Sequence, residues 1–366
     1  MTFLCDKNLL QNAIGIVSKA LPQKSPIAAI EGILFVSEGE ELKLTCTDLS
    51  ITIETKIPAE ISTTGSIVLP GKLLAEIIRR MPEGRIQFSG SVADGVVISS
   101  SGSKMSVSAF SAEEYPSLPE VEKNKCFTIG QALLKNMINQ TIFASAIDES
   151  RPILTGCLFE IESSNINVVA LDGYRLALRS ASLGEEYDNM SAIIPSHALA
   201  EISKVLADTD AEVTIYLQKS YCMIDLEHTK IITRLIEGEF IKYKPIIPKE
   251  SESIVTVSKT QLLESIDRAW LMVKENSRNN YIVLKFIDKK MIITSRSDTG
   301  NAYEELPVSG NPKEIEIGFN PRYFVDCLKN LEDEFITLNF TTALSPSVIK
   351  PIEGDKYLYL ILPVRI

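Results

Sequence analysis

The chain has 366 residues, of which 45% are hydrophobic and 23% charged, and its formal net charge is −11. This length is two to three times that of the commonest domain, and the composition excludes a disordered or collagen-like chain. No apolar run reaches the roughly 18 residues that a membrane span needs, and the start MTFLCDKN lacks the pattern of a signal peptide, so we expect a cytoplasmic protein.

The first third of the chain predicts a helix within residues 6–20, where apolar side chains recur at helical spacing. Two strands joined by a polar turn are expected over 31–48. A short apolar strand at 66–69 then leads into a second helix over 70–81, because the pattern changes there from a continuous apolar run to helical periodicity. The alternating segment KMSVSAF (104–110) predicts a further strand.

The middle third repeats this order of elements. A helix is predicted within 130–147, and two strands with a polar turn are predicted over 155–172. A strand at 191–194 leads into a helix over 195–207, and KIITRLI (230–236) predicts another strand. The dipeptide Asp172-Gly173 separates two strand patterns and is typical of a hairpin turn.

The last third has the same order again, with a helix within 258–275, two strands over 281–297, and a strand at 314–319 before a helix over 320–331. The residues that open the second helix of each copy stand 125 residues apart; they are Pro70, Pro195 and Asn320.

A repeat of this length predicts three similar domains. The polar segments VEKNK and PKESES separate the copies, which gives domains at 1–122, 125–250 and 253–366. We expect an α+β fold in which each domain packs two helices on antiparallel sheet.

Positive charge is concentrated in the predicted helices. Their six segments hold 12 Lys and Arg against 7 Asp and Glu, whereas the rest of the chain holds 25 against 41. The net charge alone argues against a nucleic-acid partner, but basic helices gathered on one surface would present a positive face to a polyanion. Weak contact of this kind suits movement along DNA better than recognition of a sequence.

On the second helix of each copy, basic side chains recur at two positions seven residues apart, which puts them on one helix face. They are Lys72, His197 and Arg322 at the first position and Arg79, Lys204 and Lys329 at the second. Acidic residues lie between them, so a solvated face with ion pairs three and four residues apart is an alternative interpretation. These acids are Glu76, Glu201 and Asp326.

The sequence offers little for catalysis. Its two histidines are His197 on a predicted helix and His228 in a predicted turn, and it has none of the nucleophile-elbow, P-loop, dinucleotide or zinc-protease motifs. Acidic clusters could be proposed as metal ligands of a hydrolase or transferase, but such clusters in loops are usually solvated. They are Glu113-Glu114, Glu185-Glu186 and Glu332-Asp333-Glu334. We expect a binding protein without metal or cofactor.

Six cysteines stand singly along the chain, with no C-x-x-C pair. We expect them to be buried small apolar residues in a reducing compartment. They are Cys5, Cys46, Cys126, Cys157, Cys222 and Cys327.

Four segments carry a family resemblance: VVALDGYRLAL (168–178), RLIEGEFIKYKPIIP (234–248), IEIGFNPRYFVDCL (315–328) and LYLILPVRI (358–366). With the threefold layout, they make the chain similar from end to end to the bacterial sliding clamps, the beta subunits of DNA polymerase III. The resemblance implies the DNA-clamp fold and a ring of two chains joined head to tail, with the helices around duplex DNA and the sheets outside. It also implies a non-catalytic processivity factor, without cofactor, that tethers the replicative polymerase, the clamp loader and other proteins with a clamp-binding motif.

By this resemblance, basic side chains of the inner helices and of one loop would face DNA. They are Lys24, Lys72, Arg79, Arg80, His197, Lys204, Arg322 and Lys329. Partner proteins would insert an apolar peptide tail into a groove between the second and third domains. That groove would comprise Arg151, Leu154, Leu171, Gly173, Tyr174, Arg175, Leu176, Ile241, Pro245, Ile246, Leu362, Pro363, Val364 and Arg365.

The groove residues leave alternatives open. Leu154, Leu176 and Ile246 could instead be ordinary core residues. The chain also departs from the commoner family pattern, with Tyr174 where His is frequent, and its peptide preference could differ accordingly. The other departures are Ile241 for Pro, Pro245 for Arg, and Leu362 and Val364 for Met. Two other functions remain as alternatives: a hydrolase or transferase with paired carboxylates, and a peptide-binding scaffold that does not bind DNA.

Overall fold

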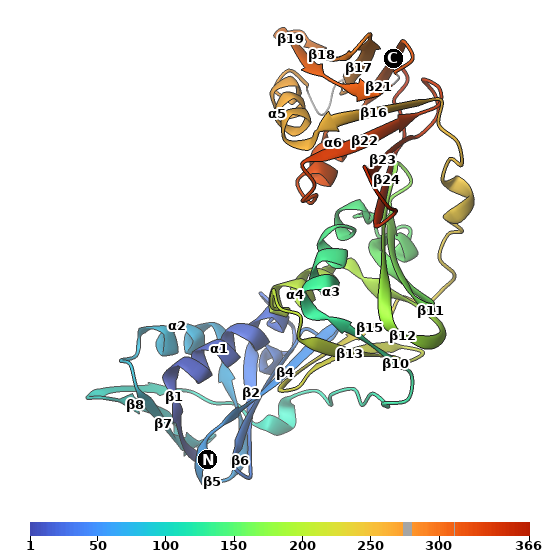
Figure 1. The fold of residues 1–366 in the computed structure, drawn as a ribbon. Coiled ribbons are helices and arrows are strands. Elements are labelled where there is room, and N and C mark those ends of the chain that lie inside the picture. Colours follow the sequence, from blue (N-terminus) through green and yellow to red (C-terminus); the bar gives the residue numbers. More distant parts are fainter. Residues whose placement is uncertain (274–279, 311) are drawn as a thin grey trace. The chain divides into compact units, whose positions relative to one another are not determined.

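The computed structural model describes residues 1–273, 280–310 and 312–366, and in this part of the chain each predicted helical segment contains an α-helix (Figure 1). The helices are α1 Lys7–Val17, α2 Gly71–Arg80, α3 Gln131–Asn139, α4 Ser196–Val205, α5 Lys259–Trp270 and α6 Pro321–Leu328. Residues 274 and 275 of the segment predicted at 258–275 lie outside the described residues.

Helix α3 is shorter than the predicted 130–147, because it ends at Asn139 and is followed by a 3₁₀ turn over Ile142–Ala144. The hydroxyl of Thr141 donates to the carbonyl oxygens of Met137 and Ile138, at 2.7 and 3.1 Å. The amide of Thr141 donates to the carbonyl of Ile138 at 3.0 Å, so at the end of the helix the i−4 bonds give way to the i−3 bond of a 3₁₀ turn.

The strands alternate with these helices in the predicted order. They are β1 Thr2–Asp6, β2 Gly32–Glu38, β3 Glu41–Thr47, β4 Ile51–Pro58, β5 Glu60–Thr63, β6 Gly65–Pro70, β7 Arg85–Ser91, β8 Gly95–Ser100, β9 Ser103–Val107, β10 Cys126–Gly130, β11 Gly156–Leu171, β12 Arg175–Pro195, β13 Glu212–Leu217, β14 Tyr221–Leu226, β15 Thr229–Arg234, β16 Ser253–Ser258, β17 Ile282–Ile287, β18 Lys290–Ser297, β19 Gly300–Pro307, β20 Ser309–Gly310, β21 Ile315–Phe319, β22 Phe335–Phe340, β23 Ser347–Pro351 and β24 Tyr357–Ile361.

Strand β11 includes the two strands predicted over 155–172. At Ser163 the backbone is left-handed, with a φ of 56°. The amide of Asn167 donates to the carboxylate of Glu160 at 3.4 Å, although seven residues of extended strand would span about 23 Å. The chain therefore turns back within β11, as the polar turn in the sequence predicts.

The chain forms two compact units, which we describe separately: Met1–Ala132 with Glu201–Leu235, and Leu133–Ala200 with Ile236–Ile366. In the first unit, an eight-stranded sheet has the order β10-β13-β14-β15-β4-β3-β2-β6, and a five-stranded sheet has the order β5-β1-β7-β8-β9. Helices α1 and α2 lie side by side (Figure 1). The rings of Phe3, Phe35 and Phe88 stack in the core, with centroids 4.7 to 6.4 Å apart.

The second unit contains a seven-stranded sheet of order β11-β12-β24-β23-β22-β16-β20 and a four-stranded sheet of order β19-β18-β17-β21. Helices α5 and α6 pack together in this unit. Its core includes Phe319 against Phe324 and Phe286 against Phe340, at centroid distances of 5.2 and 4.9 Å.

The compact units do not coincide with the three sequence repeats, because strands of neighbouring repeats pair with each other. Strand β15 of the second repeat pairs antiparallel with β4 of the first, and β12 of the second repeat pairs antiparallel with β24 of the third. The predicted domain limits at 122–125 and 250–253 remain a prediction.

The turns predicted at His228 and at Asp172-Gly173 are confirmed, between β14 and β15 and between β11 and β12. Five of the six cysteines are buried, whereas Cys126 is half-buried. Among the described residues, no helix is long and apolar enough to cross a membrane. The same residues contain no cluster of three His, Cys, Asp or Glu side chains that could hold a metal ion.

Candidate functional site

Helix α2 shows how the sequence exposes its basic side chains. Its apolar residues Leu74, Ile77 and Ile78 are buried because they recur at intervals of three and four and face the sheet. Arg79 and Arg80 of the last turn are exposed, and so is Lys72 in the first turn. Basic residues in a last turn also interact favourably with the helix dipole.

A cleft of about 640 Å³ brings two predicted DNA-facing residues together. Arg79 from α2 and Lys204 from α4 line it with residues of α1, all within the first compact unit. The predicted basic face is therefore shared between helices of different repeats. In the loop after α1, Lys24 is exposed, and the neighbouring Gln23 carbonyl accepts a hydrogen bond of 2.7 Å from Lys72.

His197, Arg322 and Lys329 are exposed as well, so all eight predicted DNA-facing side chains are accessible to solvent. Exposure is equally expected for a solvated helix face, and the ion pairs of that alternative interpretation are present. Glu76 accepts from Arg79 and Arg80 at 2.6 and 3.0 Å. The other pairs are Lys204 with Glu201 at 2.7 Å and Arg322 with Asp326 at 3.7 Å.

These pairs do not prevent binding of a polyanion. The hydrogen bond from Arg79 holds the pKa of the Glu76 carboxyl below its ordinary value, so the pair is ionised at neutral pH. Exposed ion pairs contribute little to stability, because water screens them and ordering long side chains opposes them. A phosphate group can therefore replace the carboxylate as the partner of Arg79 at little cost.

The predicted groove residues fall into four groups within the second compact unit. Leu154, Leu171 and Leu176 belong to a buried apolar cluster, and Leu362 packs against its margin. The core interpretation of Leu154 and Leu176 therefore describes their burial correctly. It is wrong for Ile246, whose side chain is 43% exposed.

The second group is the turn between β11 and β12. The carboxylate of Asp172 accepts hydrogen bonds from the backbone of Tyr174 and Arg175, at 2.8 and 3.0 Å. Gly173 has a φ of 95°, a conformation that favours glycine. The guanidinium of Arg151 lies over this turn, 3.5 Å from where a Cβ of Gly173 would stand.

The guanidinium of Arg175 links this turn to the third repeat. It donates to Asp172 at 3.0 Å, to Asp326 of α6 at 2.6 Å, and to the carbonyl of Phe143. It also stands 4.7 Å from the ring centroid of Tyr323. Because Arg175 is only 9% exposed and these partners occupy it, its role is to position the turn, and we call this arrangement the Arg175 clasp.

The third group is the C-terminal segment 362–366, which backbone hydrogen bonds fix at two points. The amide of Leu362 donates to the carbonyl of Tyr174 at 2.9 Å, and that of Val364 donates to Gly318 at 2.8 Å. Pro363 is half-buried between them, and Arg365 is exposed. The tail thus runs from the β11–β12 turn to strand β21.

The fourth group is Ile241, Pro245 and the adjacent Ile246. Ile241 and Pro245 line a separate cavity of about 380 Å³ beside β11. Its wall is held by Glu160, which accepts from the hydroxyl of Tyr243 at 2.8 Å and lies 3.2 Å from Lys244. Tyr243 is buried in the same apolar cluster as Leu154. The same buried apolar cluster therefore contains the first group of groove residues and supports the wall of this cavity.

Sequence reasoning missed three residues of this site: Phe143, Tyr323 and Asp326. Tyr323 stacks on Tyr174 with centroids 6.4 Å apart, and Asp326 accepts from Arg175 across a separation of 151 residues. The pattern did mark Asp326, but only as an acid on a helix face. Its contact with Arg175 arises from the pairing of β12 with β24, which periodicity does not reveal.

Comparison with known proteins covers the whole chain. Models of the N-terminal, central and C-terminal domains of the DNA polymerase III beta subunit match residues 1–119, 128–242 and 244–365. The chain is 32% identical over 379 residues to the beta sliding clamp of Halalkalibacterium halodurans, and 32% identical over 377 residues to that of Bacillus subtilis, with 100% of each chain covered.

Solved structures of the same family superpose on the chain over its whole length. A DNA polymerase sliding clamp from Bacillus subtilis superposes with a TM-score of 0.96 at 32% identity, covering 100% of this chain and 99% of the other. A putative DNA polymerase III beta subunit from Eubacterium rectale superposes with a TM-score of 0.95 at 34% identity, with 100% of both chains covered.

Proposed function

The chain belongs to the beta-subunit family of DNA polymerase III, the sliding clamps, and we propose that two copies close head to tail into a ring around duplex DNA. A sliding clamp is a processivity factor of the replicative polymerase and catalyses no reaction itself. DNA and the polymerase are therefore partners of this chain. We further propose that it acts in the cytoplasm.

The observation that carries ring closure is the repeated pairing between neighbouring repeats. Strand β4 of the first repeat pairs with β15, and its counterpart, the start of β12, pairs with β24. In the third repeat the counterpart of β4 is β19, and in the first repeat the counterpart of β15 is β9. Each of these strands ends its sheet. Antiparallel pairing of β9 with β19 of a second copy would repeat the same junction.

Both edges have features of a strand that needs a partner. Met105 of β9 is 44% exposed, and Tyr303 of β19 is 59% exposed. Unpaired edges with apolar side chains are templates for pairing with another chain. A closed pair of chains buries two such edges on each copy, whereas an open chain of copies leaves edges free at its ends.

The register inferred from the two internal junctions puts Met105 opposite Ala302 and Lys104 opposite Tyr303. Replacing Tyr303 by Lys would set two like charges opposite each other, which destabilises a strand pair. We expect Tyr303→Lys to have the 40.5 kDa mass of one chain in solution and the unaltered protein to have about twice that mass. Adding Lys104→Glu should restore the larger mass, and a double variant that stays monomeric would refute this register.

We propose that the eight exposed basic residues of the helices and the first loop hold the duplex by contacts with phosphates. The support is their exposure, the cleft shared by Arg79 and Lys204, and the screened ion pairs that a phosphate can replace. Such contacts are independent of sequence and weaken with salt.

Reversing charge at Arg79, Lys204 and Lys329 together should impair loading and sliding on nicked circular DNA without unfolding the protein. The matched control reverses three exposed lysines in loops, Lys219, Lys249 and Lys289. Unaltered processivity of the polymerase with the first triple variant would contradict the assignment. Retention that survives linearisation of the circle would contradict enclosure, and absence of retention would favour a scaffold that does not bind DNA.

We also propose that the C-terminal segment, the β11–β12 turn and the cluster beneath them receive the apolar peptide tail of the polymerase, the clamp loader and similar partners. An apolar floor with charged rim groups such as Arg151 suits such a tail. Removing residues 362–366 should abolish binding of a peptide ending in Leu-Phe while the mass of the ring is unchanged. Peptide affinity that survives this truncation would refute the groove assignment.

A further inference from the structure

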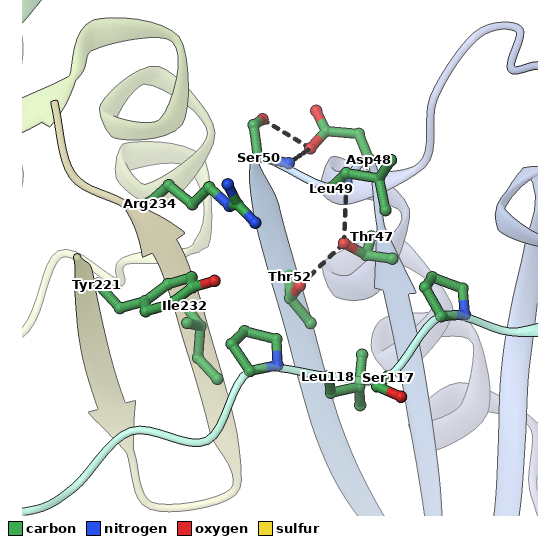
Figure 2. A pocket seen from close by; sticks show the side chains of 12 residues that line it. Thr47, Asp48, Leu49, Ser50, Thr52, Ser117, Leu118, Tyr221, Ile232 and Arg234 are labelled. Carbon is green, nitrogen blue, oxygen red and sulfur yellow. Dashed lines mark hydrogen bonds between the residues drawn. The ribbon is translucent and has the colours of Figure 1, made fainter.

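A cavity of about 530 Å³ lies at the junction of the first and second repeats, entirely within the first compact unit (Figure 2). We call it the junction cavity. It is open to solvent on one side and is lined by the turn between β3 and β4, the segment Pro116–Pro119, and side chains of β14 and β15. The ring proposed above leaves this cavity without a function.

The junction cavity stands at the position that the peptide groove occupies one repeat later. Thr52 pairs with Ile232 at this junction as Leu176 pairs with Leu360 at the next. The amide of Arg234 donates to the carbonyl of Ser50 at 3.1 Å, as Leu362 donates to Tyr174. Internal duplication has therefore produced two sites of the same backbone design.

Their side chains differ in chemistry. The positions of Leu171, Leu176 and Leu362 in the second site are taken by Thr47, Thr52 and Arg234 in the junction cavity. The hydroxyls of Thr47 and Thr52 are 2.9 Å apart and share one hydrogen bond, and the hydroxyl of Thr47 donates to the carbonyl of Ile51 at 3.0 Å. The junction cavity is thus a mixed polar and apolar site with one cation.

Arg234 supplies that cation. Its side chain is exposed, with the guanidinium carbon 5.8 Å from the ring centroid of Tyr221. Within the described part of the chain, the guanidinium has no hydrogen bond or ion pair, and Figure 2 shows it pointing toward the start of β4, next to Ser50. Asp48 directs one carboxylate oxygen at Ser50 and the amide of Ile51, at 2.7 to 2.9 Å.

Leu49 is a second, independent sign of function. Its φ is 76°, in the left-handed region where a side chain is strained, and its side chain is 51% exposed at the cavity rim. The corresponding residue of the second site is Gly173, which has no side chain to strain. An exposed apolar side chain in a strained conformation points to a binding role, because folding alone favours glycine there.

The opposite wall is preformed. The hydroxyl of Tyr115 donates a hydrogen bond to the carbonyl oxygen of Thr45 at 3.3 Å, and Leu118 packs against the buried cluster around Tyr115. Pro116 and Pro119 fix the backbone between and beyond them. A ligand would therefore not have to order this wall.

We propose that the junction cavity is a second docking site for protein partners, which takes a short extended peptide with a carboxylate side chain opposite Arg234 and a branched apolar side chain against Leu49 and Leu118. The unpaired guanidinium favours an anionic group on the ligand, and the apolar rim favours an apolar side chain next to that group. A phosphate-rich ligand would need more than this one cation. The volume of about 530 Å³ lies within the range of about 300–1,000 Å³ for ligand pockets, so it fits a few residues.

Methyl NMR of the full-length protein with labelled Leu and Ile tests the proposal. The probe is the capped peptide acetyl-Ala-Leu-Asp-Leu-amide, with the Asn analogue for comparison. We expect saturable shifts of the methyl signals of Leu49, Leu118 and Ile232, and Arg234→Gln should weaken binding of the Asp peptide about fivefold or more, but not that of the Asn peptide. Lys230→Gln on the same strand is the matched control and should bind normally.

Leu49→Gly separates binding from folding, because glycine relieves the strained φ. The variant should unfold at the same temperature as the unaltered protein or a higher one, yet bind the Asp peptide more weakly. The proposal is overturned by equal binding to Arg234→Gln or Leu49→Gly, by shifts confined to Leu362 and Ile241, or by no shift at about 5 mM peptide. If the ring does not close, the peptide should still shift the methyl signals of Leu49, Leu118 and Ile232. The docking proposal and the ring proposal can therefore be refuted independently.

Discussion

The Arg175 clasp predicts that Asp326→Asn weakens the second compact unit. Asp326 accepts from Arg175 at 2.6 Å, and the side chain of Arg175 is almost fully buried. A hydrogen bond to a charged group contributes roughly 1.5–3 kcal/mol. The asparagine oxygen still accepts, Asp172 still pairs with Arg175, and Asp326 is partly exposed, so we expect a loss of about 1.5 kcal/mol, at the lower end of that range.

Urea unfolding measures this loss. With a slope of about 2–3 kcal/mol/M for a unit of this size, the transition of the second unit should shift by about 0.5–0.8 M. Glu76→Gln is the matched control, because the same chemical change there affects only exposed pairs with Arg79 and Arg80. The urea midpoint of Glu76→Gln should equal that of the unaltered protein within experimental error. Equal shifts for the two variants would refute the view that the clasp is stabilising.

Two further predictions concern titratable groups. Burial opposes ionisation of Glu160, but hydrogen bonds from Tyr243, Lys244 and Asn167 outweigh it and hold the pKa of that carboxyl below its ordinary value. Glu160→Gln should therefore cost stability at neutral pH, and the difference should shrink below about pH 4, as urea midpoints will show; a difference that grows in acid would contradict this. Among the cysteines, burial raises the pKa of Cys5 and Cys222 to about 12, so a thiol reagent should rapidly label only Cys126 in the native protein and all six when unfolded.

Local patterns predicted the elements well because each depends on neighbouring residues. The period of α2 fixes which of its side chains are exposed, and the polar residues between two apolar runs predict the turn at Ser163 within β11. The end of α3 was not predicted, because apolar residues continue at helical spacing through the 3₁₀ turn Ile142–Ala144 that follows it.

The site was predicted less completely than the fold. The identity of groove residues came from resemblance, and burial then divided them: Leu154 lies in the core, whereas Ile246 is exposed. The contact between Arg175 and Asp326 could not be predicted, because it depends on which strands of different repeats pair. Spacing within one helix carries no information on that pairing.

The strand pairs β15–β4 and β12–β24 have a consequence for dissecting the molecule. Excising the middle third would cut hydrogen-bonded ladders on both sides and expose the backbone of Thr229–Thr233 and Arg175–Arg179 to water. An isolated middle fragment would therefore tend to associate through these unpaired edge strands. Exchange of one repeat for another is correspondingly constrained, because any substitute must bring edge strands of matching length and register.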